Sequence, residues 1–555
     1  MSEAFSPSHP QCSWQELLQV PDDTSLSSFM LESVHPLKPQ YGVPCLVEGQ
    51  TGRKITIAEM RARTAALAAA LSTRYSIGDG DVVMISSPNH VDYPVIVWAV
   101  HALGAIVTLS NPKFTKYEIM KQARITKATL LILHSSVITT ISSDLTQLGV
   151  STDRIVSFGD IGRLWNCSVE DLIAEHHSKN FSIDHSVNLG GDRVAMLALS
   201  SGTTGVPKAV KLSHRGLIVN ILQMACHIAQ SSIKGFNPGD IVLQTLPIFH
   251  VAGFVFGMTV VVTEQYDFLR MLEDIVRFGV TTLTLVPPQA ITLCKHPATR
   301  YFPLDTVKMV FMGAAPVSED LSRSVAATVP GAQVGQLYGL TEVSCSLSMT
   351  HPEHSSIGSS GKLLPGTEAR VVRFDGTLAD FGERGELYIK SPCSALGYLD
   401  NIDATRETFC DGWVRTGDEV LLTSENELFV FDRIKDVIKV KGFQVAPAEL
   451  EGHLLGHPDV VDAAIIGISH PYSGQTPFAF VVLREAAERR TEKAEQAAVL
   501  QASILNYVSE RTAHYKRISG IRFVHTIPKT PSGKVLRRTL RESWEKEKAR
   551  EKARL

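Results

Sequence analysis

The chain lacks the cysteine spacing that a zinc site or a disulfide framework would need. Its eight cysteines are scattered over 555 residues and form no Cys-x-x-Cys pair. This disfavours structural zinc and disulfides and indicates a reducing environment. Residues 1–11 contain no basic segment followed by an apolar one, so a secretory signal is not predicted.

Long apolar runs and a strong net charge are also missing. The longest apolar stretches, 95–109 and 251–262, are interrupted by His or Gly, so they predict buried helix and strand and not a membrane span. A formal net charge of -3 provides no general attraction for nucleic acid or anionic lipid.

The composition is that of a folded protein with more than one domain. Apolar residues make up 44% and charged residues 20% of the chain, as in ordinary soluble enzymes. A chain of 555 residues exceeds what one hydrophobic core normally supports. Up to about residue 430, apolar strand-like runs such as 82–85 and 283–286 alternate with helical patterns. This rhythm predicts an α/β fold of parallel β-sheets layered with helices.

A charged segment, Asp432-Arg433-Ile434-Lys435-Asp436, separates two strand patterns and is a candidate boundary. It divides the chain into a large domain, 1–431, and a small domain, 432–555. In the small domain we expect a helix opened by Pro447, strands at 461–468 and 478–483, and a long helix over 491–512. The charged tail, residues 534–555, predicts a surface helix. The remainder is therefore a small α+β domain.

The strongest local signal is the segment Leu199-Ser200-Ser201-Gly202-Thr203-Thr204-Gly205-Val206-Pro207-Lys208, which directly follows a predicted strand. Its hydroxyls, glycines and lysine are suited to surround phosphate oxygens. The alternative is a polar hairpin, since the same residues form turns. It is not a Walker A loop, because Lys208 follows Pro207 and has no Ser or Thr after it.

Further motifs make the pattern specific. In chain order they are Leu246-Pro247-Ile248-Phe249-His250, Gly313-Ala314-Ala315-Pro316, Gln336-Leu337-Tyr338-Gly339-Leu340-Thr341-Glu342, Gly385-Glu386-Leu387, Trp413-Val414-Arg415-Thr416-Gly417-Asp418, Asp432-Arg433-Ile434-Lys435, Lys439-Val440-Lys441-Gly442-Phe443-Gln444 and Pro531-Ser532-Gly533-Lys534. The chain thereby resembles the adenylate-forming superfamily of acyl-CoA synthetases, peptide-synthetase adenylation domains and luciferases. Within it, residues 441–451 are most similar to coumarate-CoA-ligase-like acyl-CoA ligases.

The resemblance implies a fold, a reaction and its cofactors. The large domain would include a β-barrel-like subdomain, and the small C-terminal domain would be mobile. The reaction would join a carboxylic acid to AMP with release of pyrophosphate and then pass the acyl group to coenzyme A. ATP, Mg²⁺ and coenzyme A are the expected cofactors and substrates.

The resemblance also assigns the nucleotide site. Tyr338 would lie against adenine, Thr341 would contact the α-phosphate, and Glu342 would bind Mg²⁺. Asp418 would hold the ribose hydroxyls, with Arg433 nearby. Taken singly, Tyr338 could be a strand end, Glu342 a solvated carboxylate and Asp418 a turn residue. The remaining predicted nucleotide contacts are Ser200, Ser201, Gly202, Thr203, Thr204, Gly205, Lys208, Gly313, Ala314, Ala315, Gln336, Leu337 and Gly339.

Two lysines of the small domain would act in successive steps. Lys534 would bridge the acyl carboxylate and the α-phosphate during adenylation, whereas Lys439 would serve thioester formation. The domain would therefore rotate about a hinge at Asp432 to Lys435. His250 would close the acyl pocket and assist attack by the thiol, although a structural histidine is the alternative. The pantetheine entrance would be flanked by Lys441, Gly442 and Gln444.

The acyl pocket is predicted from small and apolar residues, namely Val251, Ala252, Phe256, Ala315, Gly339, Cys345 and Ser346. His250 stands where peptide-synthetase domains carry an Asp, so amino acids are disfavoured. A medium- or long-chain fatty acid or an aryl (phenylpropanoid-like) acid fits this lining. Three alternatives remain open: an acyl-AMP ligase that loads a carrier protein, a luciferase-like oxygenase and a non-catalytic nucleotide-binding protein.

The last three residues, Ala553-Arg554-Leu555, resemble a peroxisomal address of the Ser-Lys-Leu type. A peroxisomal import receptor is therefore an expected partner, and the location is peroxisomal or otherwise cytoplasmic. The alternative is the frayed end of a charged helix.

Overall fold

The computed structural model describes residues 20, 24–32, 43–141, 150–159, 167–176, 191–200, 208–230, 239–248, 258–315, 317–351, 356–434, 436–440, 443–470, 474–491, 493–512, 514–530 and 533–552. Within these ranges no helix is both long and apolar enough to cross a membrane. Residues 553–555 lie outside them, so peroxisomal import stays a prediction.

The first sheet of the large domain has the described strand order β6-β5-β3-β4-β7-β8, in which β3 to β7 run parallel and β8 returns antiparallel to β7. Its strands are β3 (Val82–Ser86), β4 (Ile106–Ser110), β5 (Leu130–His134), β6 (Ile155–Phe158), β7 (Val194–Ser200) and β8 (Lys208–Ser213). The helices of this part are α2 (Leu26–Leu31), α3 (Ile57–Tyr75), α4 (Tyr93–Ala102), α5 (Lys116–Thr126), α6 (Ser135–Ile141), α7 (Val169–His176) and α8 (His214–Gln230).

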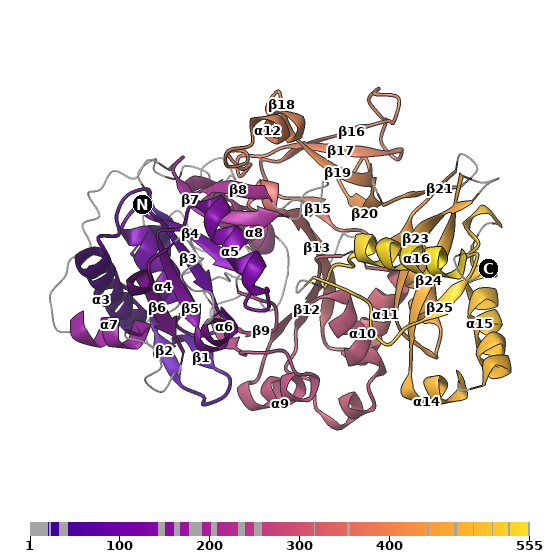
Figure 1. The fold of residues 1–555 in the computed structure, drawn as a ribbon, viewed down its shortest axis with the longest axis horizontal. Helices are drawn as coiled ribbons and strands as arrows, with labels where there is room; N and C mark the ends of the chain where they lie inside the picture. The colour runs from indigo at the N-terminus through magenta and orange to yellow at the C-terminus, as the bar shows by residue number, and fades with distance from the viewer. Residues whose placement is uncertain are drawn as a thin grey trace.

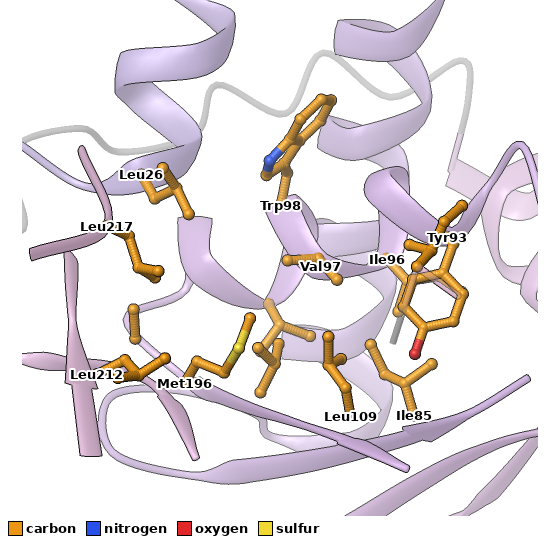
Figure 2. Close-up of a cluster of buried hydrophobic side chains, with 14 of the residues drawn as sticks. Leu26, Ile85, Tyr93, Ile96, Val97, Trp98, Leu109, Met196, Leu212 and Leu217 are labelled. Atoms are coloured by element: carbon orange, nitrogen blue, oxygen red, sulfur yellow. The ribbon is translucent and has the colours of Figure 1, made fainter. Parts of the chain in front are cut away.

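Helix α4 shows why the apolar run at 95–109 does not need a membrane. All ten of its residues are buried, because α2 and α3 pack on it and its other side faces the sheet. Figure 2 shows Ile96 and Val97 of α4 above Ile85 and Leu109 of the neighbouring strands β3 and β4. A helix that is apolar all round is stable only when it is enclosed in this way. The prediction of a buried helix and strand is confirmed.

The second sheet has the described order β15-β14-β13-β12-β11-β9-β10-β1-β2. The six adjacent strands β13, β12, β11, β9, β10 and β1 are parallel. Strand β2 at one edge and strands β14 and β15 at the other are antiparallel to their neighbours. Its strands are β1 (Pro44–Glu48), β2 (Lys54–Thr56), β9 (Ile241–Gln244), β10 (Thr259–Val262), β11 (Thr282–Leu285), β12 (Met309–Met312), β13 (Gln333–Leu340), β14 (Cys345–Met349) and β15 (Lys362–Leu363), and its helices are α9 (Phe268–Phe278), α10 (Pro287–Lys295) and α11 (Glu319–Thr328).

A third, antiparallel sheet completes the large domain where a β-barrel-like subdomain is expected. It contains β16 (Glu368–Val372), β17 (Arg384–Lys390), β18 (Phe409–Cys410), β19 (Trp413–Leu422) and β20 (Leu428–Arg433), with helix α12 (Ile402–Thr408) before β18. Arg415 of β19 donates to both carboxylate oxygens of Glu386 on β17, at 2.7 and 2.9 Å. This bidentate pair fixes the register of the two strands.

The small domain has its own sheet, of described order β22-β21-β24-β23 with β25 paired to β24. It lies at one end of the molecule, next to α10 and α11 of the large domain (Figure 1). Its elements are β21 (Ile438–Val440), β22 (Phe443–Val445), α13 (Pro447–Gly456), β23 (Val460–His470), β24 (Gly474–Leu483), α14 (Glu485–Glu488), α15 (Ala494–Ser509), β25 (Ile521–Phe523) and α16 (Arg537–Lys552). The α+β prediction is confirmed, although α15 is shorter than 491–512, and α16 lies within the predicted tail helix of 534–555.

A buried ion cluster ties this domain together at its junction with β20. Arg537, the first residue of α16, donates to both oxygens of Glu451 at 2.8 Å. Its guanidinium also lies 4.0 Å from Asp432 and 3.9 Å from Asp436, and Asp432 accepts a hydrogen bond from the Ala448 amide at 3.0 Å. The predicted hinge segment is therefore bonded directly to α13 and α16.

Arg537→Met is expected to destabilise the small domain by about 3–5 kcal/mol, because it leaves Glu451 buried without its cation. Thermal unfolding of the full chain should show this as a lowered transition. The matched control is Arg538→Met, whose exposed side chain pairs with Glu542, and which should cost less than about 1 kcal/mol. Equal effects of the two substitutions would contradict the role of the cluster.

Candidate active site

The site begins where β11, β12 and β13 end at the same edge of the second sheet. The Gly313 motif follows β12, and β13 contains the residues 336–340 of the next motif. A β-carbon placed on Gly313 would lie 2.8 Å from the Leu337 carbonyl oxygen, so a larger residue there would push the two segments apart. The carboxyl ends of parallel strands are the usual place for a ligand site in such sheets.

Gly339 allows a still closer approach between β13 and β14. A β-carbon at this position would lie 1.7 Å from the Cys345 carbonyl oxygen. The two strands pair antiparallel, with Gly339 opposite Ser346. A residue with a side chain would not fit between the two strands at this position. Gly339 therefore allows the short distance between β13 and β14, which contain predicted nucleotide-binding and acyl-pocket residues.

The turn between these strands is held in an uncommon backbone conformation. It contains the short helix η5 (Thr341–Val343) and then Ser344 and Cys345, whose φ angles are 61° and 142°. Ala314, at φ 67°, is a third non-glycine residue of this kind. Such conformations persist only where the surroundings enforce them, and they concentrate at functional sites.

Two buried side chains hold the strained turn. Ser344 Oγ donates to the Cys393 carbonyl at 2.7 Å. Asn220 of α8 donates to the Ser346 carbonyl at 2.7 Å and accepts from the Ser346 amide at 3.0 Å. The backbone beside the predicted acyl pocket is thus fixed from two other parts of the fold.

Glu342 lies at the centre of a first polar cluster. Its Oε1 accepts hydrogen bonds from Ser200 Oγ at 3.1 Å and from the Tyr398 hydroxyl at 2.9 Å. Lys208 Nζ lies 5.0 Å from the centre of the Tyr398 ring. One described end of the Ser- and Thr-rich segment therefore contacts Glu342 directly, and the other lies beside its partner Tyr398. Burial, followed by the charge of Glu342, raises the pKa of Tyr398, so this phenol remains a neutral donor.

A second cluster contains Tyr338, Asp418 and Arg433. The Tyr338 hydroxyl donates to Asp418 Oδ2 at 2.6 Å, and Arg433 Nε lies 3.4 Å from Asp418 Oδ1. Asp418 and Arg433 are paired across β19 and β20. Burial and the adjacent carboxylate raise the pKa of Tyr338 well above its usual value. The residues predicted for adenine and ribose thus lie together.

The small domain brings one predicted residue to the same edge. A β-carbon on Gly533 would lie 3.2 Å from Val286 Cγ2, and Gly533 has a φ of 82°. Val286 follows β11 directly, and the Leu285 carbonyl accepts from the Gly313 amide at 3.3 Å. The turn that carries Lys534 is closed by a hydrogen bond from the Lys534 amide to Thr530 Oγ1 at 3.1 Å. It therefore packs on the large domain beside the Gly313 motif.

Other predicted residues are placed only in part. Lys439 and Gln444 face each other across the β21–β22 pair, but their side chains lie outside the described structure. Also outside the described residues are the predicted Ser201, Gly202, Thr203, Thr204, Gly205, His250, Val251, Ala252, Phe256, Lys435, Lys441 and Gly442.

Sequence reasoning missed two residues of the site, Tyr398 and Asn220. Tyr398 follows Gly397 far from the other motifs, and its segment, between β17 and α12, bridges to Val210 of β8. Asn220 sits in the middle of an apolar helix, α8. A polar residue at a buried helical position was the one signal for it.

Comparison with known proteins agrees with this geometry. The family model of AMP-binding enzymes matches residues 36–399, and the model of their C-terminal domain matches residues 449–534. The chain belongs to the AMP-binding enzyme family. The predicted boundary at residue 432 lies between the two matches. The resemblance to adenylate-forming enzymes is thereby confirmed.

Relatives and solved structures extend the similarity over almost the whole chain. The 4-coumarate--CoA ligase 5 of Oryza sativa subsp. japonica is 33% identical over 94% of this chain and 95% of its own length. The structure of ATP-bound MatB from Rhodopseudomonas palustris has a TM-score of 0.78 at 25% identity and covers 94% of this chain and 98% of its own. An anthranilate CoA ligase in complex with anthranoyl-AMP has a TM-score of 0.83 at 22% identity, covering 95% and 98% of the two chains. The last of these shows the shared fold.

Gly339→Ala is expected to displace the Cys345 carbonyl and to lower kcat/KM of the ATP-dependent reaction by about 100-fold, as small misplacements in active sites do. Steady-state kinetics with circular dichroism to verify folding would measure this. Gly78→Ala is the control, because a β-carbon there meets nothing within 4 Å. Wild-type kinetics of Gly339→Ala would refute the close-approach argument.

Proposed function

We propose that the protein is an AMP-forming acid–thiol ligase, which converts a carboxylic acid and ATP to an acyl-adenylate and pyrophosphate and then forms acyl-CoA and AMP. The observation that supports it most is the convergence at one sheet edge. The Glu342 cluster, the Tyr338–Asp418 pair and the Gly533–Lys534 turn come from three sheets and two domains. ATP would be held by these three groups together.

In the adenylation step an oxygen of the acid attacks the α-phosphorus, and the bond to pyrophosphate breaks. Catalysis of such a transfer consists of positioning and of stabilising the charge that develops. Lys208 would bind the outer phosphates, and Lys534 would bridge the acid and the α-phosphate. Asp418, whose Oδ2 accepts from Tyr338 at 2.6 Å, would accept from ribose hydroxyls.

Mg²⁺ fits the residues at Glu342. Mg²⁺ prefers hard oxygen ligands and is usually bound by one or two carboxylates together with substrate phosphates and water. Glu342 is such a carboxylate, and it is surrounded by hydroxyl groups of Ser200 and Tyr398. Within the described residues no cluster of three or more His, Cys, Asp or Glu exists, which suits an ion bound mainly through ATP. When bound, it would neutralise charge on the phosphate oxygens.

In the second step the thiol of CoA attacks the acyl carbon and AMP leaves. Lys439 is on β21 and Lys534 on the turn after β25, so both are carried by the small domain. Their use in different steps requires rotation of that domain about residues 432–435. The β21–β22 pair, with Lys439 opposite Gln444, would then approach the thiol.

For the acid we propose an aryl, phenylpropanoid-like substrate. The similarity to a 4-coumarate--CoA ligase over 94% of the chain supports this class. Among the described pocket residues, Ala315, Gly339, Cys345 and Ser346 are all small and leave room for a ring. A medium- or long-chain fatty acid is the second candidate, because the same small residues would accommodate a chain. Loading of a carrier protein would use the same nucleotide contacts.

A panel of acids should identify the substrate class. Pyrophosphate and AMP are expected only when ATP, Mg²⁺ and an acid are present, with hydroxycinnamic and other aryl acids most active, fatty acids second and amino acids inactive. Free CoA should then yield a thioester detectable by mass spectrometry. Pyrophosphate release without a CoA thioester would indicate a carrier-loading ligase. Failure of the purified protein to form AMP with any acid of the panel would disprove the proposed function.

The two lysines should separate the half-reactions. Lys534→Ala is expected to lower acid-dependent pyrophosphate exchange by at least about 100-fold, the scale of a lost charge-stabilising donor, while CoA still attacks supplied acyl-adenylate. Lys439→Ala should show the reverse. Lys546→Ala, an exposed position on α16, serves as the control. If both active-site variants impair the same half-reaction, the two-orientation mechanism is wrong.

A further inference from the structure

Lys295 joins the two domains at a distance from every residue with an assigned role. It is the last residue of α10 in the large domain. Its ammonium donates to three backbone carbonyls of the small domain, those of Leu455 at 2.6 Å, Val460 at 2.9 Å and His457 at 3.4 Å.

The three acceptor carbonyls lie at and just beyond the C-terminal end of α13, where a cation is stabilising. Leu455 belongs to the last turn of α13, His457 is the C-cap residue of that helix, and Val460 is the first residue of β23. Carbonyls at the C-terminal end of a helix have no partner within it and carry the negative end of the helix dipole. The Lys295 ammonium both satisfies these groups and attracts that dipole. The contact is therefore directional, and it exists only when α13 points its C-terminal end at α10.

Helix α10 connects this contact to the Lys534 turn. Its N-cap residue is Val286, which contacts Gly533. Its first residues, Pro287 and Pro288, pre-set the helical backbone. A third contact of the same interface joins α13 to the N-cap of α11, because a β-carbon on Gly452 would lie 3.1 Å from Ser318 Cβ. One short helix thus touches the small domain at both ends, beside Lys534 and at the end of α13.

We propose that Lys295 is a positioning residue for the adenylation step: it holds the small domain in the orientation that sets the Lys534 turn against the end of β11. This inference rests on the proposed function. The same contacts must break before the domain can turn and present Lys439. Removal of the ammonium should therefore slow adenylation and leave thioester formation unchanged or faster.

The charge of Lys295 is itself sensitive to pH. Burial and the nearby Arg484 lower its pKa to about 8, whereas Cys294 opposes the shift. His457, which also faces it, has a pKa lowered by burial and by Lys295 and Arg490, although Asp459 raises it. Lys295 is charged below pH 8, so the contact is strongest there and weakens as pH rises through that value. Adenylation should consequently decline on the alkaline side.

The test measures the half-reactions separately. Lys295→Met should lower acid-dependent pyrophosphate exchange about tenfold, the effect expected for a cation lost from a helix C-terminus, while thioester formation from supplied acyl-adenylate is not reduced. Lys295→Arg should retain the exchange and lose the decline above pH 8, because a guanidinium keeps its charge. Arg300→Met, an exposed cation five residues away, should behave as wild type.

Hydrogen exchange provides a readout that needs no activity. Amides of residues 455–460 should exchange faster in Lys295→Met than in the wild type and in Arg300→Met. The inference is overturned if Lys295→Met lowers both half-reactions equally, if it adenylates as the wild type does, or if exchange at 455–460 does not change. Absence of pyrophosphate exchange in the wild type with every acid would instead overturn the proposed function.

Discussion

The site depends on the close approach of backbone segments at the ends of β12 and β13. Gly313 and Gly339 permit separations that no side chain would allow, since a β-carbon at these positions would lie 2.8 and 1.7 Å from carbonyl oxygens. Register then brings residues 336–342 and 345–346 to one place. The strained turn through Ser344 and Cys345 is a consequence, and the hydrogen bonds of Ser344 and Asn220 stabilise it. The chemistry is thus prepared by backbone geometry before any charged group is considered.

Both functional carboxylates are paired with a phenol. Tyr398 donates to Glu342 and Tyr338 donates to Asp418, and burial is the first cause that raises the pKa of each phenol. A neutral hydroxyl donor orients a carboxylate and leaves its negative charge in place, whereas a cationic partner in a salt bridge would neutralise that charge. In the proposed function Glu342 would bind Mg²⁺ and Asp418 would accept from the ribose hydroxyls, and neither role is opposed by a neutral phenol. Arg433, at 3.4 Å from Asp418, offsets part of the charge only there.

The sequence predicts local structure and chemistry well and spatial relations poorly. Apolar alternation and the Pro at 447 correctly predict the layered domain and the start of α13, because both signals act within a few residues. The bond between Ser200 and Glu342 joins positions 142 residues apart, and only the family resemblance suggested it. Tyr398 has no local signal, because its contact with Glu342 arises from packing of distant segments. Asn220 is signalled only as a polar residue within an apolar helix. The tail helix is predicted as a solvated one, whereas its first residue, Arg537, is buried in an ion cluster that distant residues complete.

A mobile domain can act on a reacting phosphorus only if it moves as one body. Arg537 lies three residues after Lys534 and binds Glu451 of α13 within the small domain, while Asp432 accepts from the Ala448 amide at the same cluster. The turn with Lys534, the helix α13 and the hinge strand β20 are therefore linked through buried charges. Because α10 contacts both Gly533 and the end of α13, the orientation of the whole body is determined by two points on one helix. The position of Lys534 is then set by the body that carries it.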